Sequence, residues 1–93
     1  MNAQTIFTTE RADQYLASLC KHFGHKVPVH LEAHAGRIEL PFGACALAAD
    51  AAGLTLTAQA DSQTDLERTI GVITSHLERF AFRENHRLAW TTP

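Results

Sequence analysis

The sequence has few of the features that mark membrane, secreted or nucleic-acid-binding proteins. No apolar run approaches the roughly 18 residues that cross a membrane. The first residues lack both the basic start and the apolar run of a signal peptide. The formal net charge is −2 with charges of both signs interspersed, whereas nucleic-acid-binding domains usually carry a clustered basic surface. We therefore expect a cytoplasmic protein that binds neither membranes nor nucleic acids.

Cysteines and catalytic motifs are also scarce. The two cysteines, Cys20 and Cys45, are too few for a disulfide scaffold, so we expect free thiols. The chain contains no G-x-S-x-G, P-loop, G-x-G-x-x-G or H-E-x-x-H motif. These absences favour a non-enzymatic protein over an enzyme. The 93 residues make one domain, 1–93, and such a chain buries roughly 60–65% of its unfolded surface, enough for one modest core.

Two segments show the period of an amphipathic helix. The first begins near Thr8 or Thr9, either of which can act as the N-cap, and it ends before Gly24. The second begins near Ser62, where residues 62–65 approximate a capping box. Apolar residues three and four positions apart are predicted to form the interface between the helices and a sheet. They are Leu16, Leu19, Phe23, Leu66, Ile70, Ile73, Leu77 and Phe80.

Outside the helices the apolar period changes to two, which is typical of strands with one buried face. The predicted strands are residues 3–8, 27–33, 37–42, 45–49, 54–59 and a last short strand around Leu88 and Trp90. Turns are predicted at residues 35–36, 50–53 and 83–85.

The element order is therefore β-α-β-β-β-β-α-β. Helices on one face of a curved antiparallel sheet would bury both apolar stripes, so we predict an α+β fold, a two-layer sandwich. A lone meander leaves an edge or a face uncovered. We accordingly expect a homodimer, with Trp90 of the terminal strand as a candidate contact.

One segment, residues 20–26, gathers a thiol, two imidazoles and two ammonium groups near the end of the first helix. Cys20 and His22 are separated by ~200° on a helix, so they chelate one ion only if the helix unwinds. A structural zinc site needs about four ligands with paired spacings, and the chain has no C-x-x-C. A composite site of Cys20 or His22 with Cys45 or His76 stays open. The alternative is that the imidazole and ammonium groups of residues 20–26 interact, as cations, with the C-terminus of the first helix and its free carbonyl groups.

The other histidines differ in their predicted surroundings. His76 lies at the edge of the apolar stripe of the second helix and is a candidate base or ligand, with Glu84 or Glu39 as its partner carboxylate. His30 and His34 share the polar face of a predicted strand, and we expect them to be solvated. His86 is expected to be equally exposed.

Three blocks of this sequence resemble the signature of a small bacterial family, domain of unknown function 2218. They are CKHFGHKV at residues 20–27, RIELPFGAC at 37–45 and SHLERFAFRE at 75–84. The resemblance covers nearly the whole chain and implies a fold similar to that of the TATA-binding protein. Family members stand alone or are appended to siderophore-interacting flavoproteins, so the resemblance implies a link to iron handling. It assigns no catalytic residues.

Five residues within these blocks become candidate ligand-binding residues: His22, His25, His76, Arg83 and Glu84. We predict a non-enzymatic accessory or binding module. Its expected partners are a second copy, a siderophore-interacting flavoprotein, or a small anionic or iron-chelate ligand. The alternative is a small metal-binding protein or enzyme that uses the three histidines. If the two helices run parallel over the sheet, His25 approaches Arg83 and Glu84 at one pole.

Overall fold

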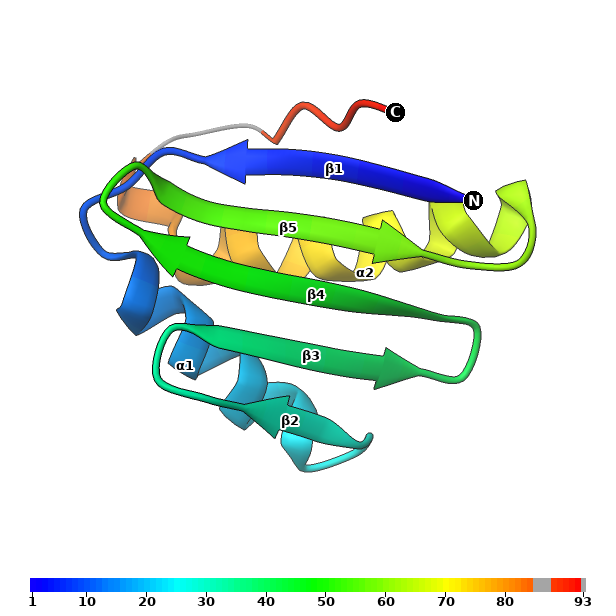
Figure 1. Cartoon of the computed structure of the whole chain (residues 1–93), viewed down its shortest axis with the longest axis horizontal. Helices are drawn as coiled ribbons and strands as arrows, with labels where there is room; N and C mark the ends of the chain where they lie inside the picture. Colours follow the sequence, from blue (N-terminus) through cyan, green and yellow to red (C-terminus); the bar gives the residue numbers. More distant parts are fainter. Residues whose placement is uncertain (85–87, 93) are drawn as a thin grey trace.

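The computed structural model describes residues 1–84 and 88–92, and these form a five-stranded antiparallel sheet with both helices on one face (Figure 1). The predicted α+β fold is confirmed. The elements are β1 (Asn2–Phe7), α1 (Ala12–Gly24), β2 (Val29–Leu31), β3 (Ala35–Leu40), β4 (Gly43–Asp50), β5 (Gly53–Gln59), α2 (Gln63–Phe80) and the short 3-10 helix η1 (Phe82–Glu84). The end of the turn predicted at 83–85 and the exposed position predicted for His86 lie outside the described residues.

The two helices run in opposite directions over the sheet, so the parallel arrangement that would bring His25 to Arg83 and Glu84 is not present. The strand order is β1-β5-β4-β3-β2, and β1 pairs antiparallel with β5. Each of these two strands is followed by a helix that packs back on the same face. Since the strands end at opposite ends of the sheet, α1 and α2 begin at opposite ends, as Figure 1 shows. Strand pairing thus sets the helix directions.

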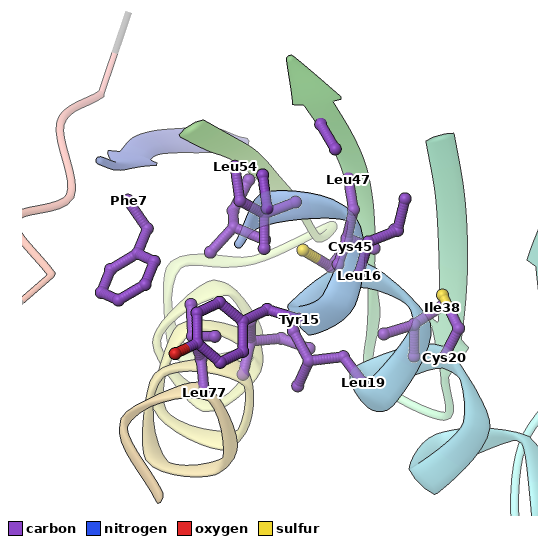
Figure 2. Close-up of a cluster of buried hydrophobic side chains, with 14 of the residues drawn as sticks. Phe7, Tyr15, Leu16, Leu19, Cys20, Ile38, Cys45, Leu47, Leu54 and Leu77 are labelled. Atoms are coloured by element: carbon purple, nitrogen blue, oxygen red, sulfur yellow. The ribbon is translucent and has the colours of Figure 1, made fainter. Parts of the chain in front are cut away.

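The core lies between the helices and the inward-facing side chains of the sheet. Figure 2 shows Leu16 and Leu19 of α1 and Leu77 of α2 meeting side chains of the central strands. The buried members of the predicted interface are Leu16, Leu19, Phe23, Leu66, Ile73 and Leu77. Ile70 is half-buried and packs against a smaller cluster. Phe80 is 36% exposed and contacts His22, so its assignment to the core is wrong.

Two glycines explain how the chain turns and how closely α1 approaches the sheet. The turn predicted at residues 35–36 lies instead at 32–34, because Gly36 is within β3. A Cβ atom on Gly36 would lie 2.8 Å from Cys20 Sγ, so this glycine permits the close approach of α1. The predicted turn between β4 and β5 is confirmed. There Gly53 has a φ of 146°, which favours glycine, and Asp50 Oδ1 accepts hydrogen bonds from two backbone N–H groups.

The C-terminal segment lies along the free edge of β1. The last predicted strand is present only as one bridge among the described residues, where Thr91 and Gln4 exchange two backbone hydrogen bonds of 2.8 Å. The Trp90 indole donates to Thr74 Oγ1 at 2.8 Å and packs on the core. Trp90 is therefore half-buried and engaged within the chain through its indole N–H. No helix in the described part is long and apolar enough to cross a membrane.

Candidate functional site

Two of the predicted histidines meet where α1 passes α2. The ring centroids of His22 and His76 are 4.8 Å apart. Aromatic rings surround this pair, because Phe23 lies 4.8 Å from His76 and Phe80 lies 5.7 Å from His22. His22 is exposed and His76 is half-buried. The contact of the two imidazoles is therefore at the surface, in a partly apolar setting.

The hydrogen bonding of His76 identifies its available nitrogen. His76 Nδ1 lies 2.7 Å from the carbonyl oxygen of Val72, one turn earlier in α2. A carbonyl only accepts, so Nδ1 carries the proton and donates. In the neutral ring, Nε2 then keeps its lone pair and can accept a hydrogen bond or bind a metal ion.

The histidines lie among further cations, and we call this group the cationic pole. It consists of His22, His25, Lys26, His76 and Arg79. Although His22 is exposed overall, partial desolvation of its ring lowers its pKa, and repulsion from the other four groups lowers it further. The ion pairs found between described residues lie elsewhere: His30 with Glu32, His34 with Asp13, Arg37 with Glu39 and Arg68 with Asp65. Lys26 and Arg79 therefore bring positive charge beside the imidazoles of the cationic pole, and neither forms an ion pair with a carboxylate in the described part of the chain.

The two cysteines do not join the histidines. Cys20 and Cys45 are free thiols, 3% and 0% exposed, and both belong to the hydrophobic core. Burial raises the pKa of Cys20 and raises that of Cys45 to about 12. Within residues 1–84 and 88–92, no three His, Cys, Asp or Glu side chains are grouped as a metal site. The composite site is thus not formed there, since a structural zinc ion needs about four ligands.

Arg83 and Glu84 lie at a different place, beside the start of α1. Glu84 Oε2 accepts hydrogen bonds from Thr9 Oγ1 at 3.0 Å and from the Tyr15 hydroxyl. Tyr15 and His25 are separated by roughly 15 Å along the axis of α1. The structure therefore does not bring His25 to Arg83 and Glu84. The cause is the antiparallel course of the helices, which places the end of α2 beside the beginning of α1.

An open hollow of about 530 Å³ adjoins this contact, and we call it the α1 hollow. Its lining comes from four separate segments: Thr8, Thr9, Glu10, Arg11, Ala51, Ala52, Arg83 and Glu84. The predicted N-cap at Thr8 or Thr9 is wrong, because α1 begins at Ala12 after Arg11. Thr9 Oγ1 instead accepts from the Arg11 backbone N–H at 3.0 Å. The hydroxyl of Thr9 therefore links Glu84 to the chain just before the helix.

Tyr15 forms the buried base of this contact. The hydrogen bond to Glu84 raises the pKa of Tyr15, burial and the carboxylate charge raise it further, and Arg11 opposes the rise. Tyr15 lies four positions before Leu19 on the apolar face of α1, and this spacing gives no sign of a polar role. No local signal joins it to Glu84, which is 69 positions away.

The chain is similar to known proteins over nearly its whole length. A family model described as "Uncharacterized protein conserved in bacteria (DUF2218)" matches residues 4–91. The NMR structure of PA4090 from Pseudomonas aeruginosa is 30% identical, with a TM-score of 0.81, covering 97% of this chain and 94% of that one. No curated protein matches the chain. The two related descriptions name neither a ligand nor an activity.

Proposed function

The chain belongs to the uncharacterised bacterial family DUF2218, whose description gives no activity. From the residues of the chain itself, we propose that it is a non-enzymatic binding module for an anionic ligand. The cationic pole is the proposed docking surface. The observation that carries this proposal is the contact of His22 with His76 among further cations, at 4.8 Å between ring centroids. Like charges held together repel one another, and a bound anion relieves that repulsion.

The surroundings of the pole favour a compact anion that also has a flat or apolar part. Phe80 is 36% exposed beside His22, so a ring or chelate of the ligand can pack against the Phe80 ring. The charged groups of the ligand can then meet Lys26 and Arg79. Guanidinium and ammonium groups bind carboxylates and related oxygen anions by charge-assisted hydrogen bonds. An anionic iron chelate has these properties, and it is the ligand class that the family resemblance implies. In this proposal the pole presents the chelate to a siderophore-interacting flavoprotein.

Binding at this pole should depend on pH. The pKa of His22 is lowered first by partial desolvation of its ring, then by the charges of His76, Lys26, Arg79 and His25. A bound anion reverses the electrostatic part of that shift, so binding takes up a proton. We therefore expect the affinity for an anion to rise as the pH falls toward and below about 6.5, the usual histidine value.

A homodimer is the second part of the proposal. The face of the sheet opposite α1 and α2 is not covered by a helix in the described part of the chain (Figure 1). Outward positions on β4 and β5 include the small side chains of Ala46, Ala48 and Thr57. A second copy packed on this face would cover it. Trp90 bonds within the chain through its indole N–H, so the proposed interface does not depend on it.

The ligand proposal is tested by amide chemical shifts of ¹⁵N-labelled protein, purified without a histidine tag and titrated with citrate and with gallium citrate, a diamagnetic stand-in for a ferric chelate. Saturable shifts around His22 and His76 are expected. Lys26→Gln combined with Arg79→Gln should weaken binding by about tenfold, since each lost ion pair contributes up to about 1 kcal/mol. The matched control is Arg68→Gln near the start of α2, where Arg68 pairs with Asp65.

Two results would overturn this function. The first is the absence of saturable shifts at the pole up to about 10 mM probe, a concentration well above a millimolar dissociation constant. The second is an equal loss of affinity in Arg68→Gln. Stoichiometric metal in the untagged protein would instead support the metal-binding alternative built on His22, His25 and His76.

A further inference from the structure

The α1 hollow is separate from the cationic pole, and its lining carries charges of both signs. Arg11 and Arg83 contribute positive charge, and Glu10 and Glu84 contribute negative charge. We infer that the α1 hollow binds a small zwitterion of the α-amino acid class, with its carboxylate toward Arg11 and Arg83 and its ammonium group toward Glu84. This inference does not depend on the function proposed for the cationic pole.

The carboxylate of Glu84 is held in position by buried groups. The hydroxyls of Thr9 and Tyr15, which are 7% and 5% exposed, both donate to Glu84 Oε2. These hydrogen bonds orient the carboxylate before a ligand arrives, as binding sites require of their charged groups. A carboxylate offers about four acceptor positions. The ammonium group of a ligand can therefore share this carboxylate with the partners that Glu84 already has.

The two arginines reach the hollow from different parts of the chain. Arg11 precedes α1, and Arg83 belongs to η1 after α2. Neither takes part in an ion pair between described residues. The Arg83 guanidinium lies 5.6 Å from the centre of the Phe82 ring, and Phe82 is itself 68% exposed. Guanidinium groups bind carboxylates in a bidentate geometry, so this pair suits the carboxylate end of the ligand.

The balance of charges decides between classes of ligand. A simple anion would meet Glu10 and Glu84, and a simple amine would meet Arg11 and Arg83. A zwitterion satisfies both signs at once. The volume of about 530 Å³ lies within the usual range for small-molecule sites, roughly 300–1,000 Å³. Ala51 and Ala52, at the turn between β4 and β5, provide a non-polar wall for a small side chain.

The test uses three probes of similar size on the full-length ¹⁵N-labelled protein: valine, isobutylamine and isovalerate. Valine carries both charges, and the other two carry one each. Valine should give saturable amide shifts at residues 8–11, 51–52 and 83–84, and it should bind at least about tenfold more tightly than either single-charge probe. The inference is overturned if valine causes no saturable shifts there, or if either single-charge probe binds as tightly as valine.

Two variants assign the charges. Arg83→Gln changes an exposed side chain and leaves the hydrogen bonds of Thr9 and Tyr15 to Glu84 intact, so valine binding should fall about tenfold while Arg68→Gln leaves it unchanged. Glu84→Gln keeps an oxygen to accept from Thr9 and Tyr15 but loses the charge, and it should reduce valine to the affinity of isovalerate. If Glu84→Gln fails to fold, Arg83→Gln decides alone, and unchanged valine binding in that variant refutes the site.

Discussion

The replacement Tyr15→Phe tests the contact that ties the end of α2 to the start of α1. It removes one hydroxyl and leaves the ring in the core beside Phe7, whose ring centroid is 5.8 Å away. Hydrogen bonds to charged groups contribute roughly 1.5–3 kcal/mol to stability. Thr9 Oγ1 still donates to Glu84 Oε2, so the carboxylate keeps a partner. We therefore expect the free energy of unfolding to fall by about 1.5–2 kcal/mol, near the low end of that range.

Urea unfolding followed by circular dichroism measures this loss. The midpoint should fall while the slope m stays constant, because the replacement changes no exposed area on unfolding. A domain of this size has a total stability of about 5–15 kcal/mol, so the change is well resolved.

The same contact predicts a pH dependence with a definite sign. The hydrogen bond to Glu84, followed by burial, raises the pKa of Tyr15 above its usual 10.0 in the folded protein. The contribution of the protonated hydroxyl to stability is therefore complete below pH 10 and is lost as the pH rises through the folded pKa. Tyr15 is the only tyrosine, so ultraviolet absorbance follows its ionisation alone. Ionisation should require a higher pH in folded than in urea-unfolded protein.

A helix-cap replacement provides the control. Ser62→Ala removes the hydrogen bond that Ser62 Oγ accepts from the Asp65 backbone N–H, at a cost of about 1 kcal/mol. That loss should not change as Tyr15 ionises, whereas the difference between wild type and Tyr15→Phe should shrink. The reasoning is refuted if Tyr15 ionises at the same pH in both states, or if Tyr15→Phe costs less than about 0.5 kcal/mol, as a surface replacement does.

Three further predictions follow from the core, the thiols and the open sheet face. Leu19→Ala or Ile73→Ala should lower the free energy of unfolding by roughly 2–5 kcal/mol, because both side chains are 0% exposed; losses below about 1 kcal/mol at both positions would contradict the packing of α1 and α2. A thiol reagent at pH 8 should modify Cys45 only on unfolding, since burial raises its pKa to about 12; rapid modification of the folded protein would disprove this. Light scattering at high concentration should give the mass of a homodimer, and a monomer mass would exclude it.

Local sequence patterns predict most of this fold. The spacing of apolar residues identifies both helices, and the period of two identifies the strands and their buried face. The pattern does not show that β1 pairs with β5 at the edge of the sheet, because the paired residues are about 50 positions apart and each strand shows only its own alternation. Gly36 shows a second limit. A glycine typical of a turn serves instead to admit Cys20 of α1 at close range.

The candidate site was predicted only in part, for the same physical reason. His22 and His76 were both identified, and the packing of α1 against α2 brings them together. Glu84 was identified too, but it meets Tyr15 rather than His25. The helical spacing predicts that the ring of Tyr15 lies in the core, but it does not predict the hydrogen bond made by the hydroxyl. A polar contact between residues 69 positions apart depends on the direction of both helices, which local periodicity does not encode.

The antiparallel helices separate the two proposed sites along α1. The cationic pole is formed near the end of α1, and the α1 hollow lies at its beginning. Residues more than about 7–10 Å apart without shared partners usually affect free energies independently. Lys26 and Arg83 share no partner among the described residues. Tyr15, which contacts Glu84 at the α1 hollow, and His25 of the cationic pole are separated by roughly 15 Å along α1. Lys26→Gln should therefore leave valine binding unchanged, and Arg83→Gln should leave citrate binding unchanged. If each replacement weakened both ligands, one shared anion site would replace the two proposed here.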